Sequence, residues 1–452
     1  MPKVFIRTYG CQMNERDSEA VAAELLQRGY ELAGSEEEAD VILLNTCSVR
    51  ERAEQKALGR MRYLAEQVAQ RRPEVVLGFL GCMAQSRGEE LIRLIPQVRL
   101  VVGTRRLWRV ADYLDEILSG RREVVCDTEM EPEKTGWTTG HVLKGPRPPV
   151  RAYVNIMQGC NQRCSFCIVP YTRGPEVSRP IEEIVRECEE LARAGVKEVI
   201  LLGQIVTSYG RRMIPVREGK SPFVQLLEAV HEVDGIERIR FTSPHPKGYG
   251  DDLVEAYGRL PKLCESAHIP VQSGSNRVLR RMRRGYTRER FLEIVQKLRR
   301  VRPEIGLGTD IIVGFPGETE EDFEQTVELV REVRFDSAFV FKFSPRRGTP
   351  AAEDPDQLPQ EVIEQRHARL LKVVNEVAAE RFQRMVGRTV EVLVEGPSHK
   401  NPNRLEGRTR CNKIVVFEGS ERHIGQLIPV RIERATAVTL YGTPVIHEGT
   451  SL

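Results

Sequence analysis

The sequence predicts an α/β protein in three domains, because its 452 residues contain two stretches of alternating strand and helix signals, separated by a linker, and a final stretch of short strands. Residues 1–118 alternate buried strands with amphipathic helices, which is typical of a parallel sheet. Residues 150–383 repeat strand and helix six times, which predicts a partial (β/α)6 barrel. Residues 384–452 change to short strands, which predicts a small β-barrel. Residues 119–149 mix charged residues with Gly and Pro and are expected to be a linker.

The first domain is expected to place three cysteines together. Its predicted strands are 3–7, 41–44, 75–80 and 100–103, and its helices are 14–28 and 48–70. Cys11, Cys47 and Cys82 follow the first three strands. The carboxyl ends of parallel strands line one crevice, and the helix that follows each cysteine is expected to lower its thiol pKa. The alternative is three ordinary buried cysteines.

The other two domains follow from the same patterns. The central strands are expected at 152–157, 198–202, 238–241, 265–269, 308–313 and 338–343. Helices are expected between them, and a long helix at 359–385 bridges to the last domain. The strands of the small barrel are expected at 390–394, 405–410, 414–417, 427–435 and 437–441.

A loop after the first central strand carries three more cysteines, Cys160, Cys164 and Cys167, at CxxxCxxC spacing. Three thiolates on one loop can ligate three irons of a four-iron cluster and leave the fourth open to a chelating molecule. Structural zinc closes all four positions, and no fourth Cys or His follows nearby. A disulfide leaves one thiol over and needs a longer loop. Three unrelated buried cysteines are the remaining alternative.

This loop resembles the cluster loop of radical S-adenosylmethionine (SAM) enzymes, and Phe166 before the last cysteine fits that pattern. The longer run 158–179 is similar to MiaB-type tRNA methylthiotransferases. The strings Tyr-Gly-Cys-Gln-Met-Asn at Cys11 and Leu-Gly-Cys-Met-Ala-Gln at Cys82 resemble the N-terminal domain of that family. Residues 395–398 and 407–413 resemble a TRAM domain, which binds RNA.

The resemblance implies a catalytic iron–sulfur enzyme with two [4Fe–4S] clusters, one on Cys160, Cys164 and Cys167 and one on Cys11, Cys47 and Cys82. The first would cleave SAM to a radical, and the second would hold the sulfur that another SAM methylates. SAM contacts are expected from the loop and from strand ends, at Phe166, Gly203, Gln204, Ser243, Gln272 and Asp310. Asp310 is a candidate buried acid. The family usually has Asn where this chain has Ile205, which puts one polar contact in doubt.

The implied reaction is methylthiolation of carbon 2 of N6-isopentenyladenosine at position 37 of tRNA, in the anticodon stem-loop. Gln12 follows Cys11 where the RimO branch, which modifies a ribosomal-protein aspartate, has Pro. Phe166 stands where the branch that modifies threonylcarbamoyl-adenosine tRNA has Tyr. Those two substrates are the enzymatic alternatives. An RNA-binding protein with structural clusters is the non-enzymatic one, although the missing fourth ligand at both sites favours chemistry.

Composition adds little about partners. The net charge is only +3, but residues 277–302 contain eleven Lys or Arg, which predicts either an RNA contact or a solvated helix face. The start lacks the apolar core of a signal peptide, and no apolar run approaches the ~20 residues of a membrane span. We therefore expect a cytoplasmic protein without membrane contact. The resemblance further implies a monomer that works with a small electron donor, such as flavodoxin or ferredoxin, and a sulfur source.

Overall fold

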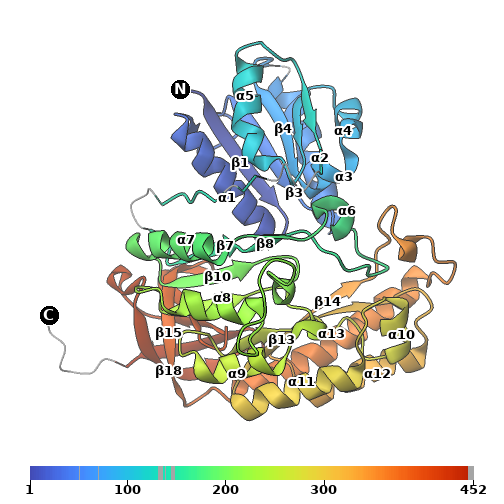
Figure 1. The fold of residues 1–452 in the computed structure, drawn as a ribbon, viewed down its shortest axis with the longest axis vertical. Coiled ribbons are helices and arrows are strands. Elements are labelled where there is room, and N and C mark those ends of the chain that lie inside the picture. The colour runs from blue at the N-terminus through green and yellow to red at the C-terminus, as the bar shows by residue number, and fades with distance from the viewer. Residues whose placement is uncertain (50, 70, 131–135, 138, 144–147, 446–452) are drawn as a thin grey trace.

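The N-terminal domain is built on one parallel sheet of six strands in the order β2-β1-β3-β4-β5-β6 (Figure 1). The computed structural model describes residues 1–49, 51–69, 71–130, 136–137, 139–143 and 148–445. The strands are β1 Lys3–Tyr9, β2 Glu31–Leu32, β3 Val41–Thr46, β4 Val76–Gly81, β5 Val98–Val102 and β6 Val125–Asp127. Short β2 and β6 are not predicted from the sequence, and β6 lies inside the segment expected to be a linker.

Helices cover both faces of this sheet. They are α1 Gln12–Gln27, α2 Glu51–Leu64, α3 Cys82–Arg87, α4 Glu89–Leu94 and α5 Val110–Leu118. Every residue of the central strands β3 and β4 is buried, as expected for a parallel sheet between two helical layers. The predicted helix 48–70 is shorter than expected, because a π-helical turn replaces its end at Ala65–Ala69.

The central domain is an open half-barrel of six parallel strands. They are β7 Arg151–Asn155, β10 Glu198–Leu202, β11 Arg238–Phe241, β12 Ser266–His268, β13 Gly306–Val313 and β14 Ser337–Lys342. Three strands form each of two sheets, and a bridge between Ile239 and Leu263 joins the sheets. The outer helices are α7 Ile181–Arg193, α8 Pro222–His231, α9 Asp251–Arg259, α10 Asn276–Arg281, α11 Arg288–Val301, α12 Glu320–Val333 and α13 Gln360–Gln383.

The C-terminal domain is a closed barrel in the order β15-β16-β17-β19-β18. Its strands are β15 Thr389–Ser398, β16 Asn401–Thr409, β17 Ile414–Phe417, β18 Leu427–Ala435 and β19 Thr439–Pro444. Arg238 and Arg240 of β11 donate to the backbone carbonyls of residues 408–410 at 2.7–2.9 Å. Arg410 pairs with Glu265, just before β12, at 2.7 Å. The barrel is therefore docked at the amino ends of the central strands.

A buried cluster of charges joins α1, the linker and α7. His141 lies 3.2 Å from Glu19 and 2.8 Å from Glu187, and Arg16 donates to the carbonyls of residues 139 and 140. Burial opposes the charged imidazole, but the hydrogen bonds that it donates to the two carboxylates outweigh this cost and raise the pKa of His141 above 6.5. The linker is thereby held between the first two domains.

This charge cluster predicts a pH-dependent stability. A raised folded-state pKa gives stability that is full below pH 6.5 and lost as the pH rises through the folded value. Urea unfolding measured from about pH 6 to about pH 9 should show this loss for the wild type and not for His141→Gln. His399→Gln, at a side chain 95% exposed, is the control and should keep the wild-type profile. A profile for His141→Gln equal to that of the wild type would contradict the assignment.

Candidate functional site

Strand register brings the first three cysteines together. Tyr9 pairs with Thr46, and Thr46 pairs with Gly81, so the ends of β1, β3 and β4 lie side by side. Cys11, Cys47 and Cys82 follow these positions by one or two residues, and adjacent strands lie about 4.8 Å apart. Burial raises the pKa of Cys82, so the expected lowering by a helix N-terminus does not hold for this thiol. We call these residues the N-terminal triad.

Two buried asparagines hold the strand ends beneath the N-terminal triad. The Asn14 amide donates to the Asn45 side chain at 3.0 Å, and Asn45 donates to the Asn14 carbonyl at 2.9 Å. Gly81 has φ +86°, and a Cβ there would lie 2.2 Å from the Asn45 side chain. The sequence strings contain these residues, but only the fold shows that they support the cysteines.

The second triad, Cys160, Cys164 and Cys167, lies on a loop closed by a short antiparallel pair. Strand β8, Met157–Gln158, pairs with β9, Val177–Ser178, at the base of this cluster loop. The loop also contains α6, Val169–Arg173. Burial and the neighbouring thiolates raise the pKa of Cys160 to about 12, and burial with Cys164 raises that of Cys167 to about 11. Three free thiolates here would repel one another, so the loop suits a bound cation.

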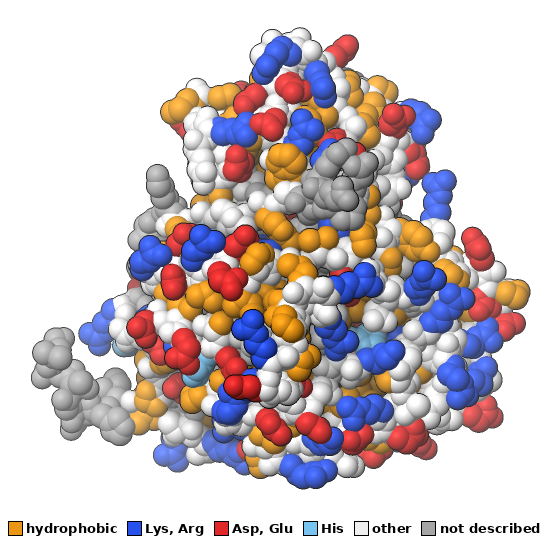
Figure 2. Space-filling view, viewed as in Figure 1, with side chains coloured by type: hydrophobic (Ala, Val, Ile, Leu, Met, Phe, Trp, Pro, Cys, Tyr) orange, Lys and Arg blue, Asp and Glu red, His pale blue; other side chains and the backbone are white. Residues whose placement is uncertain are grey.

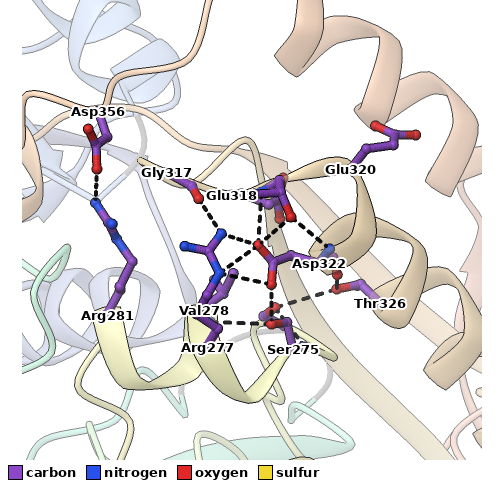
Figure 3. A network of polar contacts seen from close by, with 12 residues as sticks. Ser275, Arg277, Val278, Arg281, Gly317, Glu318, Glu320, Asp322, Thr326 and Asp356 are labelled. Atoms are coloured by element: carbon purple, nitrogen blue, oxygen red, sulfur yellow. Dashed lines mark hydrogen bonds and ion pairs between the residues drawn. The ribbon is translucent and has the colours of Figure 1, made fainter.

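The basic segment after α10 anchors the cluster loop. Arg284 donates to the Cys164 sulfur at 3.3 Å, and Ser165 donates to the carbonyls of Arg281 and Met282. Figure 3 shows what fixes α10 itself: Asp322 of α12 accepts from Arg277 and Ser275 at its start. Arg284 is a site residue that the sequence analysis missed, because only the fold brings it to the loop.

The basic run at 277–302 is largely paired within the protein. Six of its members form ion pairs with acidic side chains: Arg277, Arg281, Arg288, Arg290, Lys297 and Arg302. In Figure 2 basic and acidic side chains are interspersed over the face that carries α11 and α12. This pattern favours the solvated-face interpretation over a dedicated RNA contact.

Four of the predicted SAM residues, Gly203, Gln204, Ser243 and Gln272, lie just beyond the carboxyl ends of strands, with varied local roles. The Gln204 side chain accepts from the Gly159 amide and so ties β10 to the cluster loop. A Cβ at Gly203 would lie 2.5 Å from Met157. Ser243 and Gln272 have left-handed backbones, with φ +56° and +70°, which costs about 1–2 kcal/mol for a residue other than Gly. Such strain gathers at functional sites.

Asp310 is not the buried acid that the sequence suggested. It is 27% exposed and lies 3.2 Å from His268. Leu307, Ile311 and Val313 of β13 pack into the helical core, so alternation turns Asp310 and Ile312 to the inside of the half-barrel. Ile205 is buried. Its apolar side chain occupies the position where the family usually has Asn, so this position offers no polar contact.

An aromatic ledge lines the inside of the half-barrel on β14. Phe339 and Phe341 are 57% and 37% exposed, stack at 6.5 Å between ring centroids, and pair with Asp310 and Ile312 of β13. Ile312 and Phe166, beside Cys167, pack against the same small apolar cluster, which contains Phe315 and Phe343. The ledge, defined as Phe339 and Phe341, therefore begins next to the cluster loop and was not predicted from the sequence.

The two triads belong to different domains, which meet at the carboxyl end of β10. Cys11 packs with Met13 against Leu202, at the end of β10, and two residues later Gln204 holds the cluster loop. On the other side, Ser344 after β14 donates to Glu51 at 2.8 Å, near the Cys47 loop. Figure 1 shows the N-terminal domain seated over this end of the half-barrel. Both triads thus lie near the carboxyl ends of the central strands.

Family comparisons agree with this division into domains. Residues 154–330 match the Radical SAM superfamily, residues 3–103 match Uncharacterized protein family UPF0004, and residues 383–445 match the TRAM domain. A radical SAM methyltransferase, TsrM from Kitasatospora setae, has a similar fold, with TM-score 0.59 and 14% identity over 78% of this chain and 75% of that one. The fold and the cysteine loop therefore define a radical SAM protein.

Relatives that match over the full length identify the family to which this radical SAM protein belongs. The chain is 53% identical over 462 residues to a tRNA-2-methylthio-N(6)-dimethylallyladenosine synthase from Akkermansia muciniphila, covering 99% of this chain and 100% of the relative. It is 53% identical to the synthase of that name from Opitutus terrae, covering 98% and 97%. The chain belongs to the family of tRNA-2-methylthio-N(6)-dimethylallyladenosine synthases.

The cluster loop predicts a steric test. Gly159 has φ +81°, and a Cβ there would lie 2.0 Å from the Pro175 carbonyl, whereas Gly120 has φ +73° and open space. Gly120→Ala should cost only backbone strain, about 1–2 kcal/mol. Gly159→Ala should cost about 1–3 kcal/mol more through the clash. Urea unfolding of both variants checks this, and equal losses would show that the loop relaxes freely.

Proposed function

We propose that this protein methylthiolates carbon 2 of N6-dimethylallyladenosine at position 37 of tRNA. The observation that carries the proposal is the pair of cysteine triads, one from each domain, near the carboxyl end of β10. In a protein whose clusters had only a structural role, each cluster would have a fourth protein ligand. The relatives described above are all named for this nucleoside, which favours it over a threonylcarbamoyl nucleoside or a ribosomal-protein aspartate.

The residues fit two [4Fe–4S] clusters and SAM. Each triad offers three thiols, and in a cluster each thiolate binds a different iron. This agrees with the finding that, among the residues described, no three His, Cys, Asp or Glu side chains meet at one metal ion. When bound, these groups would supply radical cleavage of SAM at the cluster loop and a methylated sulfur at the N-terminal triad.

The chain's own residues would bind and orient the reactants. Arg284 would hold Cys164, and Gln204 would keep the loop on β10, beside Gly203. Phe166, Ser243, Gln272 and Asp310 remain our candidates for contacts to SAM at the rim of the lumen. The ledge offers exposed aromatic faces to an unstacked base and its apolar tail, which suits a modified adenosine.

The remaining partners follow from the same proposal. The anticodon stem-loop of tRNA would present the base at the lumen, and the C-terminal barrel would hold RNA. A small electron donor such as flavodoxin or ferredoxin, and a sulfur source, would serve the clusters. We propose a cytoplasmic monomer. In the part of the chain that the structure describes, no helix is long and apolar enough to cross a bilayer.

Cysteine replacement tests the cluster assignment. Anaerobically reconstituted protein should hold about eight irons, and replacing either triad by Ala should leave about four. Loss of Cys160, Cys164 and Cys167 should abolish SAM cleavage, measured as 5′-deoxyadenosine. Loss of Cys11, Cys47 and Cys82 should keep cleavage and abolish the methylthio nucleoside, measured by mass spectrometry of a dimethylallyl-modified stem-loop. Methylthio product from the second variant would refute the division of labour.

The ledge predicts substrate preference. Phe339→Ala and Phe341→Ala should weaken binding of the dimethylallyl stem-loop about tenfold, because stacking of one base contributes ~1–3 kcal/mol. Binding of SAM should change little, and the unmodified stem-loop should lose less affinity than the modified one. Leu32→Ala, at an exposed residue of β2, is the control. Equal affinity for the modified RNA in all variants would remove the ledge from the RNA site.

A further inference from the structure

Helix α6 carries a buried arginine from the cluster loop into the N-terminal domain. Arg173 is 3% exposed, and its Nη2 lies 2.7 Å from the Asp17 carboxylate of α1. Arg173 lies only six residues after Cys167 in the sequence. The structure places its guanidinium against α1 of the N-terminal domain, and α6 itself packs against α3 (Figure 1).

The second half of this guanidinium faces the N-terminal triad. The Cys82 thiol lies beside it, and the charge of Arg173 also acts on Cys11. The Nη1 atom is fully buried and reaches no hydrogen-bond acceptor among the residues described. A buried donor left without an acceptor costs about 1–3 kcal/mol, so its placement calls for an acceptor that joins the site.

Neighbouring contacts fix the guanidinium in this position. Thr104 donates to the Thr172 carbonyl at 2.6 Å, and Arg105 donates to the Arg173 carbonyl at 3.0 Å. Asp17, itself buried, balances the charge of Arg173. The side chain therefore cannot turn to another acceptor without breaking a buried ion pair, which would cost about 3–5 kcal/mol.

We propose that Arg173 is a positioning residue that donates, through Nη1, to a sulfur atom of the cluster held by Cys11, Cys47 and Cys82. The acceptor is an inorganic sulfide or the sulfur carried on the open iron. This rests on the proposed function, because it needs a cluster at that triad. Hydrogen bonds to cluster sulfurs and nearby positive charge favour the reduced cluster and so raise its reduction potential. The two terminal nitrogens of Arg173 would thus donate to the Asp17 carboxylate and to the cluster sulfur at the same time.

The test is a redox titration of the reconstituted full chain, followed by electron paramagnetic resonance. SAM should perturb the signal of the Cys160 cluster and so separate it from the other. In Arg173→Gln we expect the constant for one-electron reduction of the N-terminal cluster to fall about tenfold, a shift of about 59 mV to lower potential. The Cys160 cluster should be unchanged. Arg240→Gln, which removes another buried and paired arginine at the far end of the barrel, is the control and should shift neither.

A second variant keeps the test decisive if Arg173→Gln fails to bind iron. Arg173→Lys keeps the charge beside Asp17 but has no second arm for the sulfur, so it should load and still titrate at lower potential. An unchanged potential and spectrum, with full iron in both Arg173 variants, would overturn this inference alone. Absence of any cluster at the N-terminal triad of the wild-type protein would instead overturn the proposed function.

Discussion

The carboxyl end of β10 is the point on which the geometry of this protein depends. Leu202 packs against Met13 and Cys11 of the N-terminal domain, and Gln204 holds the start of the cluster loop. Two parallel sheets from different domains therefore meet end to end at one strand. Because both sheets are rigid and buried, the separation of the two triads is set by packing and not by a flexible hinge.

Sequence reasoning was strongest where chemistry depends on spacing along the chain. The CxxxCxxC loop is local, and the other three cysteines each follow a clear buried strand, so a parallel sheet alone brings them together. Strands such as β10 and β11 match the predicted bounds residue for residue. The short edge strands β2 and β6 escaped prediction because two or three residues carry no periodic signal.

Interactions between distant segments explain the remaining differences. The basic run at 277–302 suggests an RNA-binding surface in the sequence. In the fold, Asp322, Asp354 and Glu332 from other parts of the chain form ion pairs with its arginines. The string 407–413, which carries the TRAM resemblance, includes Arg410 and Lys413. These two residues form ion pairs with Glu265 and Asp336 of the central domain, respectively. Asp310 appeared buried because strand residues usually are, but an open half-barrel exposes its inner face.

The docking of the C-terminal barrel at the amino ends of the central strands has a further consequence for scale. The cysteine triads lie at the opposite ends, and β13 alone, at eight residues and ~3.3 Å each, spans roughly 26 Å. An RNA that touches both the barrel and the lumen must bridge at least that distance. The central domain would then set the distance between the two contact points on the RNA. A base would reach the lumen only when it lies at that fixed distance from the part of the RNA bound by the barrel.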